Sequence, residues 1–173
     1  MVAPRLLGST LSTTFDGILV AVVLDEVEAY GGSTDPASHA YRSRTDRNEP
    51  MFEDAGAVYV YRSYGIHWCM NVVTGQEGSA SAVLLRGGTV TRGLNTVIAR
   101  RKRTDHLADG PGKLCQALGV DGTMSGSLLN DGPINLTLSP KPLNPVETTV
   151  RIGISKAKDR PWRFRIPTDH SAP

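Results

Sequence analysis

Short apolar runs of strand length, separated by turn residues, recur along almost the whole chain. Runs rich in Val, Ile, Leu and Tyr that are bounded by Gly, Pro, Asn, Asp or Ser are typical of β-strands. The predicted strands are residues 17–30, 57–62, 66–73, 81–86, 134–138, 149–154 and 162–166. Helices are predicted at 89–102 and 111–118, the second of which begins with Pro111 and ends before Gly119. The pattern therefore predicts an α+β fold.

The length of 173 residues suits one compact domain. We therefore expect a single domain over 1–173, with a tail at 167–173 that has no apolar periodicity and frays. The most apolar run, Gly17 to Leu24, is too short to span a bilayer, so no membrane partner is expected. Because no secretory leader pattern opens the chain, we expect a protein that stays inside the cell.

Basic residues are concentrated in two stretches, although the formal net charge is only +2. No Asp or Glu lies between Gly78 and Thr104, a segment with six Arg and Lys residues, and residues 150–166 carry six more against Asp159 alone. Such clusters suit a DNA backbone, because each neutralised phosphate releases condensed counterions. On composition alone, however, a solvated helix face and a solvated hairpin explain them better.

The segment from Asp25 to Tyr30 combines carboxylates with an aromatic ring. Strand alternation places Glu26, Glu28 and Tyr30 on one face. If that face lines a pocket, Glu28 can hold a water for attack, and the Tyr30 ring can support a planar base. Alternatively, the carboxylates form the solvent face of an edge strand. The pattern alone leaves both interpretations open.

Residues 58–71 are predicted to form a β-hairpin with its turn near Ser63, Tyr64 and Gly65. Tyr64 lies at the tip, where little core is available to bury an aromatic ring. In a minor-groove binder, such a ring can act as a wedge that fills the space left by an extruded nucleotide. The alternative is that Tyr64 folds back on its own hairpin.

Two further segments are candidates for binding. The segment from Gly31 to Pro50 is long for a connection in a compact domain, which favours a binding role. Gly110-Pro111-Gly112-Lys113 opens a predicted helix, where amides and a lysine can bind a phosphate. It lacks the Walker pattern, so a DNA phosphate is a better candidate than a nucleotide. The histidines and cysteines lack the usual ligand spacing, and no metal site is predicted.

A series of motifs resembles the alkyladenine (3-methyladenine, or methylpurine) DNA glycosylase family. They follow the family's order and cover nearly the whole chain. The motifs are Glu-Val-Glu-Ala-Tyr at 26–30, Asp-Pro-Ala-Ser-His-Ala-Tyr-Arg at 35–42, Arg-Asn at 47–48, Met-Phe at 51–52, Tyr-Val-Tyr-x-x-Tyr-Gly-x-x-x-Cys-Met-Asn at 59–71, Val-Leu-Leu-Arg at 83–86, Gly-Pro-Gly-Lys-Leu-Cys-Gln-Ala-Leu at 110–118, Asp-Gly-Pro at 131–133, Arg-Ile-Gly-Ile at 151–154 and Pro-Trp-Arg-Phe at 161–164.

The resemblance implies a single α+β domain with a curved, mainly antiparallel sheet, flanking helices and a protruding β-hairpin. It also implies a monofunctional glycosylase of base excision repair that uses no metal or organic cofactor. Such an enzyme acts as a monomer on the minor groove of double-stranded DNA and flips out alkylated or deaminated purines. Hydrolysis of the N-glycosidic bond then leaves an abasic site. The expected location is the bacterial cytoplasm with its nucleoid, or the nucleus of a eukaryote.

The resemblance also implies roles for individual residues around the expected base pocket. Glu28 stands where the family keeps the general base, and Arg86 where it keeps a basic residue close to that carboxylate and its water. Tyr30 and His39 stand where one face of the flipped base is stacked. Tyr61 stands where the family stacks the other face.

Further residues are expected at the pocket edge and on the DNA. Asn71 matches the position that tests the exocyclic amino group of guanine, and Tyr64 matches the residue that intercalates through the minor groove. We expect Arg47 and Lys113 to contact the DNA as well.

The chemistry of the residues agrees with this assignment and leaves two alternatives. No candidate lysine lies beside Glu28 in the sequence, which argues for water rather than an amine as nucleophile, and hence for no lyase step. A non-catalytic binder of damaged DNA would keep Tyr64 and the basic clusters without needing Glu28. A hydrolase of free nucleosides would not need the basic clusters, and its activity would lack a steep salt dependence.

Overall fold

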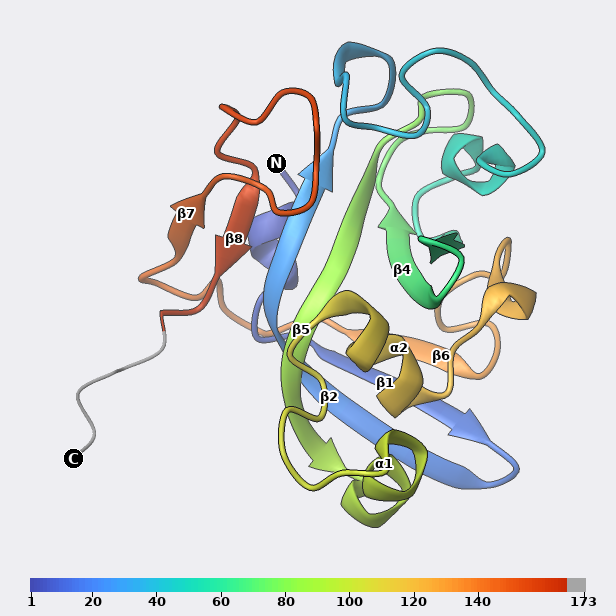
Figure 1. The fold of residues 1–173 in the computed structure, drawn as a ribbon, viewed down its shortest axis with the longest axis vertical. Helices are drawn as coiled ribbons and strands as arrows, with labels where there is room; N and C mark the ends of the chain where they lie inside the picture. The colour runs from blue at the N-terminus through green and yellow to red at the C-terminus, as the bar shows by residue number, and fades with distance from the viewer. Residues whose placement is uncertain (168–173) are drawn as a thin grey trace.

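The computed structural model describes residues 1–167, which form an eight-stranded sheet with helices on one face (Figure 1). Adjacent strands follow the order β3-β4-β5-β2-β1-β6, with β8 paired to β2 and β7 paired to β8, and every pair is antiparallel. The strands are β1 (Thr10–Phe15), β2 (Ile18–Tyr30), β3 (Val58–Ser63), β4 (His67–Val73), β5 (Ala82–Arg92), β6 (Ile134–Thr137), β7 (Glu147–Thr149) and β8 (Arg163–Arg165).

The long strand β2 bends in the middle and changes partner there. Its first half pairs with β1, and its second half, from Glu26 to Glu28, pairs with β8. The register against β5 shifts on both sides of Glu26. Such irregularities bend a strand and raise its twist. The predicted α+β class with a curved, mainly antiparallel sheet is therefore confirmed.

Helix α2 (Pro111–Leu118) covers the sheet and closes the main core (Figure 1). Its first turn holds Pro111, which has no amide to leave unpaired, and it ends at Gly119 with a φ of 75°. Leu114 and Leu118 lie one turn apart and are fully buried against the sheet. The other helix is α1 (Leu94–Arg101), and the 3-10 turns are Ala3–Leu6, Gly32–Thr34, Glu49–Phe52 and Gly122–Met124.

Strand β1 was not predicted, although its turn carries a strong local signal. Phe15 pairs with Ile18, so the connection consists of Asp16 and Gly17 alone. Both have positive φ, 51° and 75°. Two-residue hairpin loops of this kind favour Asp-Gly, because both positions need left-handed backbone.

The helix predicted from residue 89 begins five positions later. Thr89 and Val90 continue β5 by pairing with Val23 and Val22, and β-branched side chains suit this pairing. Gly93, with a φ of 75°, ends the strand and precedes the helix. The prediction of a helix at 89–92 was therefore wrong.

The strand predicted at 149–154 was also wrong beyond Thr149, where β7 ends. The next residues bond to the interior of the protein instead of to a neighbouring strand. Arg151 forms a buried ion pair, and the amide of Ile152 donates to a carboxylate of β2.

The single domain over 1–173 stays a prediction, and residues 168–173 of the tail expected to fray lie outside the described residues. Within residues 1–167, no helix is long and apolar enough to cross a membrane.

Candidate active site

A recess of about 650 Å³ opens between three segments that are far apart in the sequence. They are the loop after β2, the β3–β4 hairpin and the loop before β8, and the two loops lie at the same end of the molecule (Figure 1). The long loop at 31–50, for which we predicted a binding role, contributes much of the wall. The predicted site residues that line the recess are Tyr30, His39, Arg47, Tyr61, Tyr64, Asn71 and Arg86.

Glu28 lies behind this wall and is fully buried. Its Oε1 accepts a hydrogen bond from the backbone amide of Ile152 at 2.8 Å, and its Oε2 accepts one from the Tyr30 hydroxyl at 2.9 Å. Nη1 of Arg86 lies 3.5 Å from Oε1. All three of these neighbours line the recess, whereas Glu28 itself does not. The carboxylate is therefore held by two hydrogen-bond donors and by the charge of Arg86, all of which line the recess.

Arg86 also connects Glu28 to a second carboxylate on the same face of β2. Its Nε donates to Oε1 of Glu26 at 2.6 Å, and Nε of Arg163 donates to the same oxygen at 2.7 Å. Burial by itself would raise the pKa of Glu26, but the hydrogen bonds from Arg163 and Arg86 lower it below its ordinary value. Burial would lower the pKa of Arg86, but Glu28 and Glu26 raise it. The two arginines and two carboxylates thus form one charge network.

Aromatic rings form the wall opposite β2. The rings of His39 and Tyr61 meet edge to face with centroids 4.5 Å apart, and Tyr59 lies 5.5 Å from Tyr61. The Tyr59 hydroxyl is 2.9 Å from Nδ1 of His39. Burial and the nearby charge of Arg47 lower the pKa of His39, which favours the neutral form of its ring. Because His39 and Tyr61 touch, one of these rings must move before a planar base can lie between them.

Asn71 and Tyr64 occupy opposite environments on the hairpin. Asn71 is buried on β4, and its Nδ2 donates to the Tyr59 carbonyl at 3.0 Å, which fixes the orientation of the amide. Tyr64 stands at the turn with a φ of 50° and is 86% exposed. The ring does not fold back onto the hairpin, so it is accessible to a ligand.

The two other residues for which DNA contact was predicted are placed differently. The Arg47 guanidinium lies over the Tyr61 ring, 5.7 Å from its centroid, at the edge of the recess. Lys113 does not line the recess, and its Nζ is 3.0 Å from Oδ1 of Asp109. Both side chains are near the surface, but Lys113 is held in an ion pair with a carboxylate.

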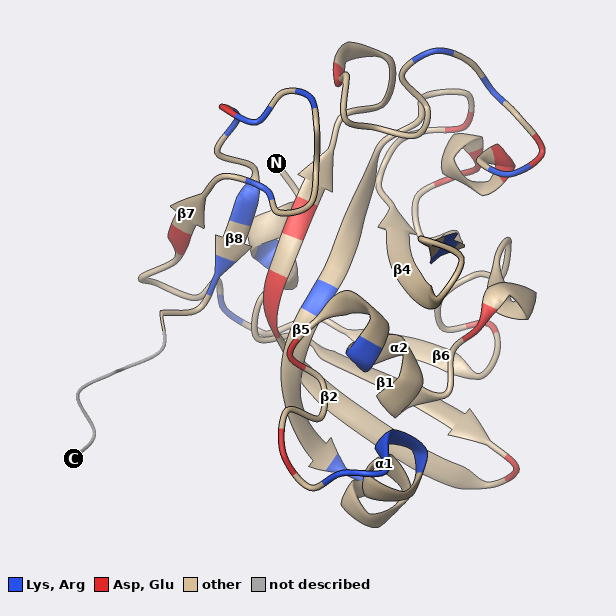
Figure 2. Cartoon of the chain, in the orientation of Figure 1, with Lys and Arg blue, Asp and Glu red and all other residues tan. Residues whose placement is uncertain are grey.

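The first basic stretch does not form one surface. Arg86 lines the recess, whereas Arg100 and Arg101 donate to the Ala117 carbonyl and the Gln116 side chain of α2. Figure 2 shows these α1 residues at the opposite end of the molecule from the basic loops beside the recess.

Much of the second basic stretch is neutralised by partners within the protein. Arg163 and Arg165 pair with Glu26 and Glu147, while Lys156 lines the recess. The charge count along the sequence therefore overestimates the positive surface available to a phosphate backbone.

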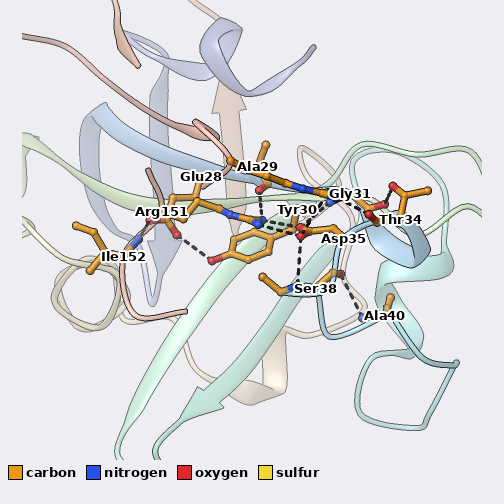
Figure 3. Close-up of polar contacts among 12 residues, drawn as sticks. Glu28, Ala29, Tyr30, Gly31, Thr34, Asp35, Ser38, Ala40, Arg151 and Ile152 are labelled. Atoms are coloured by element: carbon orange, nitrogen blue, oxygen red, sulfur yellow. Dashed lines mark hydrogen bonds and ion pairs between the residues drawn. The ribbon is translucent and has the colours of Figure 1, made fainter. Parts of the chain in front are cut away.

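Sequence reasoning missed a buried ion pair behind Tyr30. Arg151 donates through Nη1 and Nη2 to the two carboxylate oxygens of Asp35, at 2.5 and 2.8 Å, and both side chains are fully buried (Figure 3). Both residues lie in motifs that carry the family resemblance, and this was the only signal available. Within the described residues, no group of three or more His, Cys, Asp or Glu side chains is arranged to hold a metal ion.

Comparison with known proteins identifies the family. A family model described as methylpurine-DNA glycosylase matches residues 1–170. The chain belongs to this family. A relative from Nocardia farcinica is 50% identical over 96% of this chain and 82% of its own, and its name assigns it as a 3-methyladenine DNA glycosylase. Relatives from Frankia casuarinae and Methanoculleus marisnigri, with the same name, are 48% and 47% identical over 94% and 95% of this chain and over 82% and 88% of their own.

Membership of the methylpurine-DNA glycosylase family makes the protein a DNA glycosylase, a hydrolase of N-glycosyl bonds in DNA. The geometry is compatible with that chemistry. Hydrolysis of an N-glycosidic bond passes through an oxocarbenium-like sugar, which a nearby carboxylate can stabilise. Rings that line a recess can stack against a planar base.

Two ion-paired carboxylates of this glycosylase, Glu26 and Asp35, predict a loss of stability in acid. The pKa of Glu26 and that of Asp35 are lowered in the folded protein, where Arg163 and Arg151 are their main hydrogen-bond partners. Their stabilisation is complete above the ordinary values of 4.5 and 3.8 and is lost as the pH falls through the lower folded values. Asp25, whose pKa is raised by burial and by Glu26, acts in the opposite direction. We expect the urea concentration at the unfolding midpoint to decrease as the pH is lowered from 6 to 3.

A Glu26→Gln protein is the comparison for this measurement. It lacks the Glu26 carboxyl group, whose pKa is lowered in the folded protein, so its urea midpoint should change less over the same pH range. An equal change in both proteins would show that Glu26 does not contribute to the acid sensitivity.

Proposed function

We propose that this glycosylase flips alkylated or deaminated purines out of double-stranded DNA and hydrolyses their N-glycosidic bond with a water activated by Glu28. The product is an abasic site. The observation that carries the proposal is the buried Glu28 carboxylate, oriented by Tyr30, Ile152 and Arg86 directly behind an aromatic recess. A general base must lie within hydrogen-bond reach of the proton that it removes. In free enzymes, however, catalytic hydrogen bonds are often long and shorten only when the substrate binds.

Access to Glu28 is a condition of this mechanism. Glu28 is fully buried, whereas Tyr30, Ile152 and Arg86, which contact its carboxylate, line the recess. We propose that the flipped nucleotide and its water reach Glu28 through a shift of these groups, with Arg86 remaining close to the carboxylate.

Alkylated purines already carry positive charge and leave readily, whereas hypoxanthine needs a proton delivered to the departing base.

The recess supplies the interactions that a flipped base requires. We propose that Tyr30 and His39 stack on one face of the base, that Tyr61 stacks on the other, and that Asn71 tests its edge. Flipping costs a few kcal/mol, and stacking is worth about 1–3 kcal/mol per base, so ring contacts of this kind are large enough to offset the cost. The contact between His39 and Tyr61 predicts that the rings separate when a base enters.

The hairpin and the rim of the recess form the proposed DNA surface. Tyr64 enters the minor groove and fills the gap in the base stack, as its exposure permits. Arg47 contacts a phosphate. Lys113 does the same once its ion pair with Asp109 is broken. We propose that the protein acts as a monomer and works where the DNA is, which in a bacterium is the nucleoid within the cytoplasm.

The test is base release from defined duplexes. Purified protein is incubated with duplexes that carry one hypoxanthine, ethenoadenine or methylated purine, and abasic sites are detected as alkali-labile breaks. We expect at least one lesion to be processed and the undamaged duplex to stay intact. No release from any lesion, or release from free nucleosides alone, would contradict the proposed function.

A further inference from the structure

Arg151 and Asp35 join the two loops that flank the recess. Asp35 lies in the loop after β2 and is held by the backbone amides of Gly31 and Ala37, each at 3.2 Å. Arg151 lies in the loop before β8 and binds both oxygens of Asp35. Its Nη1 also donates to the Ala29 carbonyl at 2.9 Å, so it is attached to β2 as well (Figure 3).

This attachment holds the residue next to Glu28 in the structure. Ile152, whose amide donates to Oε1 of Glu28, follows Arg151 directly in the chain. Packing does little to hold this segment, because Val150 and Ile152 are 51% and 48% exposed, whereas Arg151 is 4% exposed. The buried guanidinium is therefore the main anchor of the Ile152 amide.

The same guanidinium supports the other donor to Glu28. It lies between two rings, 4.7 Å from the centroid of Tyr30 and 5.1 Å from that of Trp162. A cation over an aromatic face is attracted by the ring quadrupole. Arg151 thus backs the Tyr30 ring, whose hydroxyl donates to Oε2 of Glu28.

We propose that Arg151, held by Asp35, is a positioning residue for the reaction at Glu28. It sets the Ile152 amide and the Tyr30 hydroxyl on the two oxygens of the carboxylate. This inference rests on the proposed function and adds a residue that does not touch the substrate. A buried ion pair is by itself weak evidence for a stabilising role, because its desolvation offsets much of its attraction. A role in geometry accounts for its three-way attachment to Asp35, Ala29 and the rings.

Arg151→Lys is the first test, because it keeps the charge but not the two parallel hydrogen bonds. A displacement of about 1 Å at a reacting group can cost about a hundredfold in rate. We expect single-turnover base release to fall about tenfold, with binding of the lesion duplex changed less than twofold. In the free protein, we expect the amide proton resonance of Ile152 to move upfield as its hydrogen bond to Glu28 lengthens.

Arg160→Lys is the matched control. Arg160 lies on the same loop, its guanidinium is 3.8 Å from Asp35 and stacks on Trp162 at 4.8 Å, but it contacts neither Glu28 nor Tyr30 in the described structure. We expect wild-type base release and a wild-type Ile152 resonance. A double variant, Asp35→Asn with Arg151→Leu, removes both buried charges and replaces Arg151→Lys if that protein does not fold.

The outcomes separate this inference from the proposed function. If a folded Arg151 variant keeps the Ile152 resonance, or loses it without slower base release, the positioning role is overturned. If the wild-type protein releases no base from any lesion, the proposed function fails. In that case the Ile152 resonance alone decides whether Arg151 positions the amide on Glu28.

Discussion

A Glu28→Gln protein is expected to lose base release by about 10²- to 10⁴-fold, the usual contribution of a positioned acid or base. Lesion-duplex binding should persist, because Glu28 lies behind the recess and does not line it. The fold should also persist, since glutamine has the same shape and Arg86 keeps its hydrogen bond to Glu26. Single-turnover release and a binding titration on the same duplex are the two measurements.

Glu77→Gln is the control for this substitution, because Glu77 is exposed and does not line the recess. It should release bases at the wild-type rate. Unchanged release by the Glu28→Gln protein would contradict the proposed mechanism. Loss of both release and binding would instead indicate that Glu28 maintains the recess.

A Tyr64→Ala protein is expected to bind the lesion duplex about fivefold to 150-fold more weakly. Stacking of one ring on the bases is worth about 1–3 kcal/mol, and each 1.4 kcal/mol is about tenfold in affinity. The Tyr64 ring is 86% exposed, so its removal should leave the urea midpoint within experimental error of the wild type. The dissociation constant is measured with a duplex that carries one lesion.

Tyr64→Phe is the matched control, because it keeps the ring and removes only the hydroxyl. It should bind like the wild-type protein. If Tyr64→Ala binds as tightly as Tyr64→Phe, the ring is not a wedge and the proposed use of the hairpin is wrong.

Local patterns predicted the elements around the site well where neighbours along the chain decide the conformation. The alternation of β2 placed Glu26, Glu28 and Tyr30 on one face, and Arg86 bridges the first two while Tyr30 contacts Glu28. The alternative of an exposed carboxylate face does not hold for Glu28, which is fully buried. The hairpin at 58–71 and helix α2 were predicted for the same reason, since their turn and end residues act locally.

Charge patterns predicted the surface less well, because they ignore the partners that folding brings. Arg151 and Arg163 were counted as part of a basic stretch, yet they pair with Asp35 and Glu26. The helix predicted from residue 89 failed for a related reason. Pairing of β5 with β2, distant in the sequence, extends the strand to Arg92.

The sequence by itself determined the α+β class, the face of β2 that carries Glu28, the hairpin with Tyr64 at its turn and, through its motifs, the family. Only the tertiary structure decided that Glu28 is buried behind the recess, that the Ile152 amide bonds to its carboxylate and that Arg151 pairs with Asp35. The physical reason is separation along the chain. Periodicity and turn chemistry act over a few residues, whereas the Arg151–Asp35 and Ile152–Glu28 contacts join positions 116 and 124 residues apart.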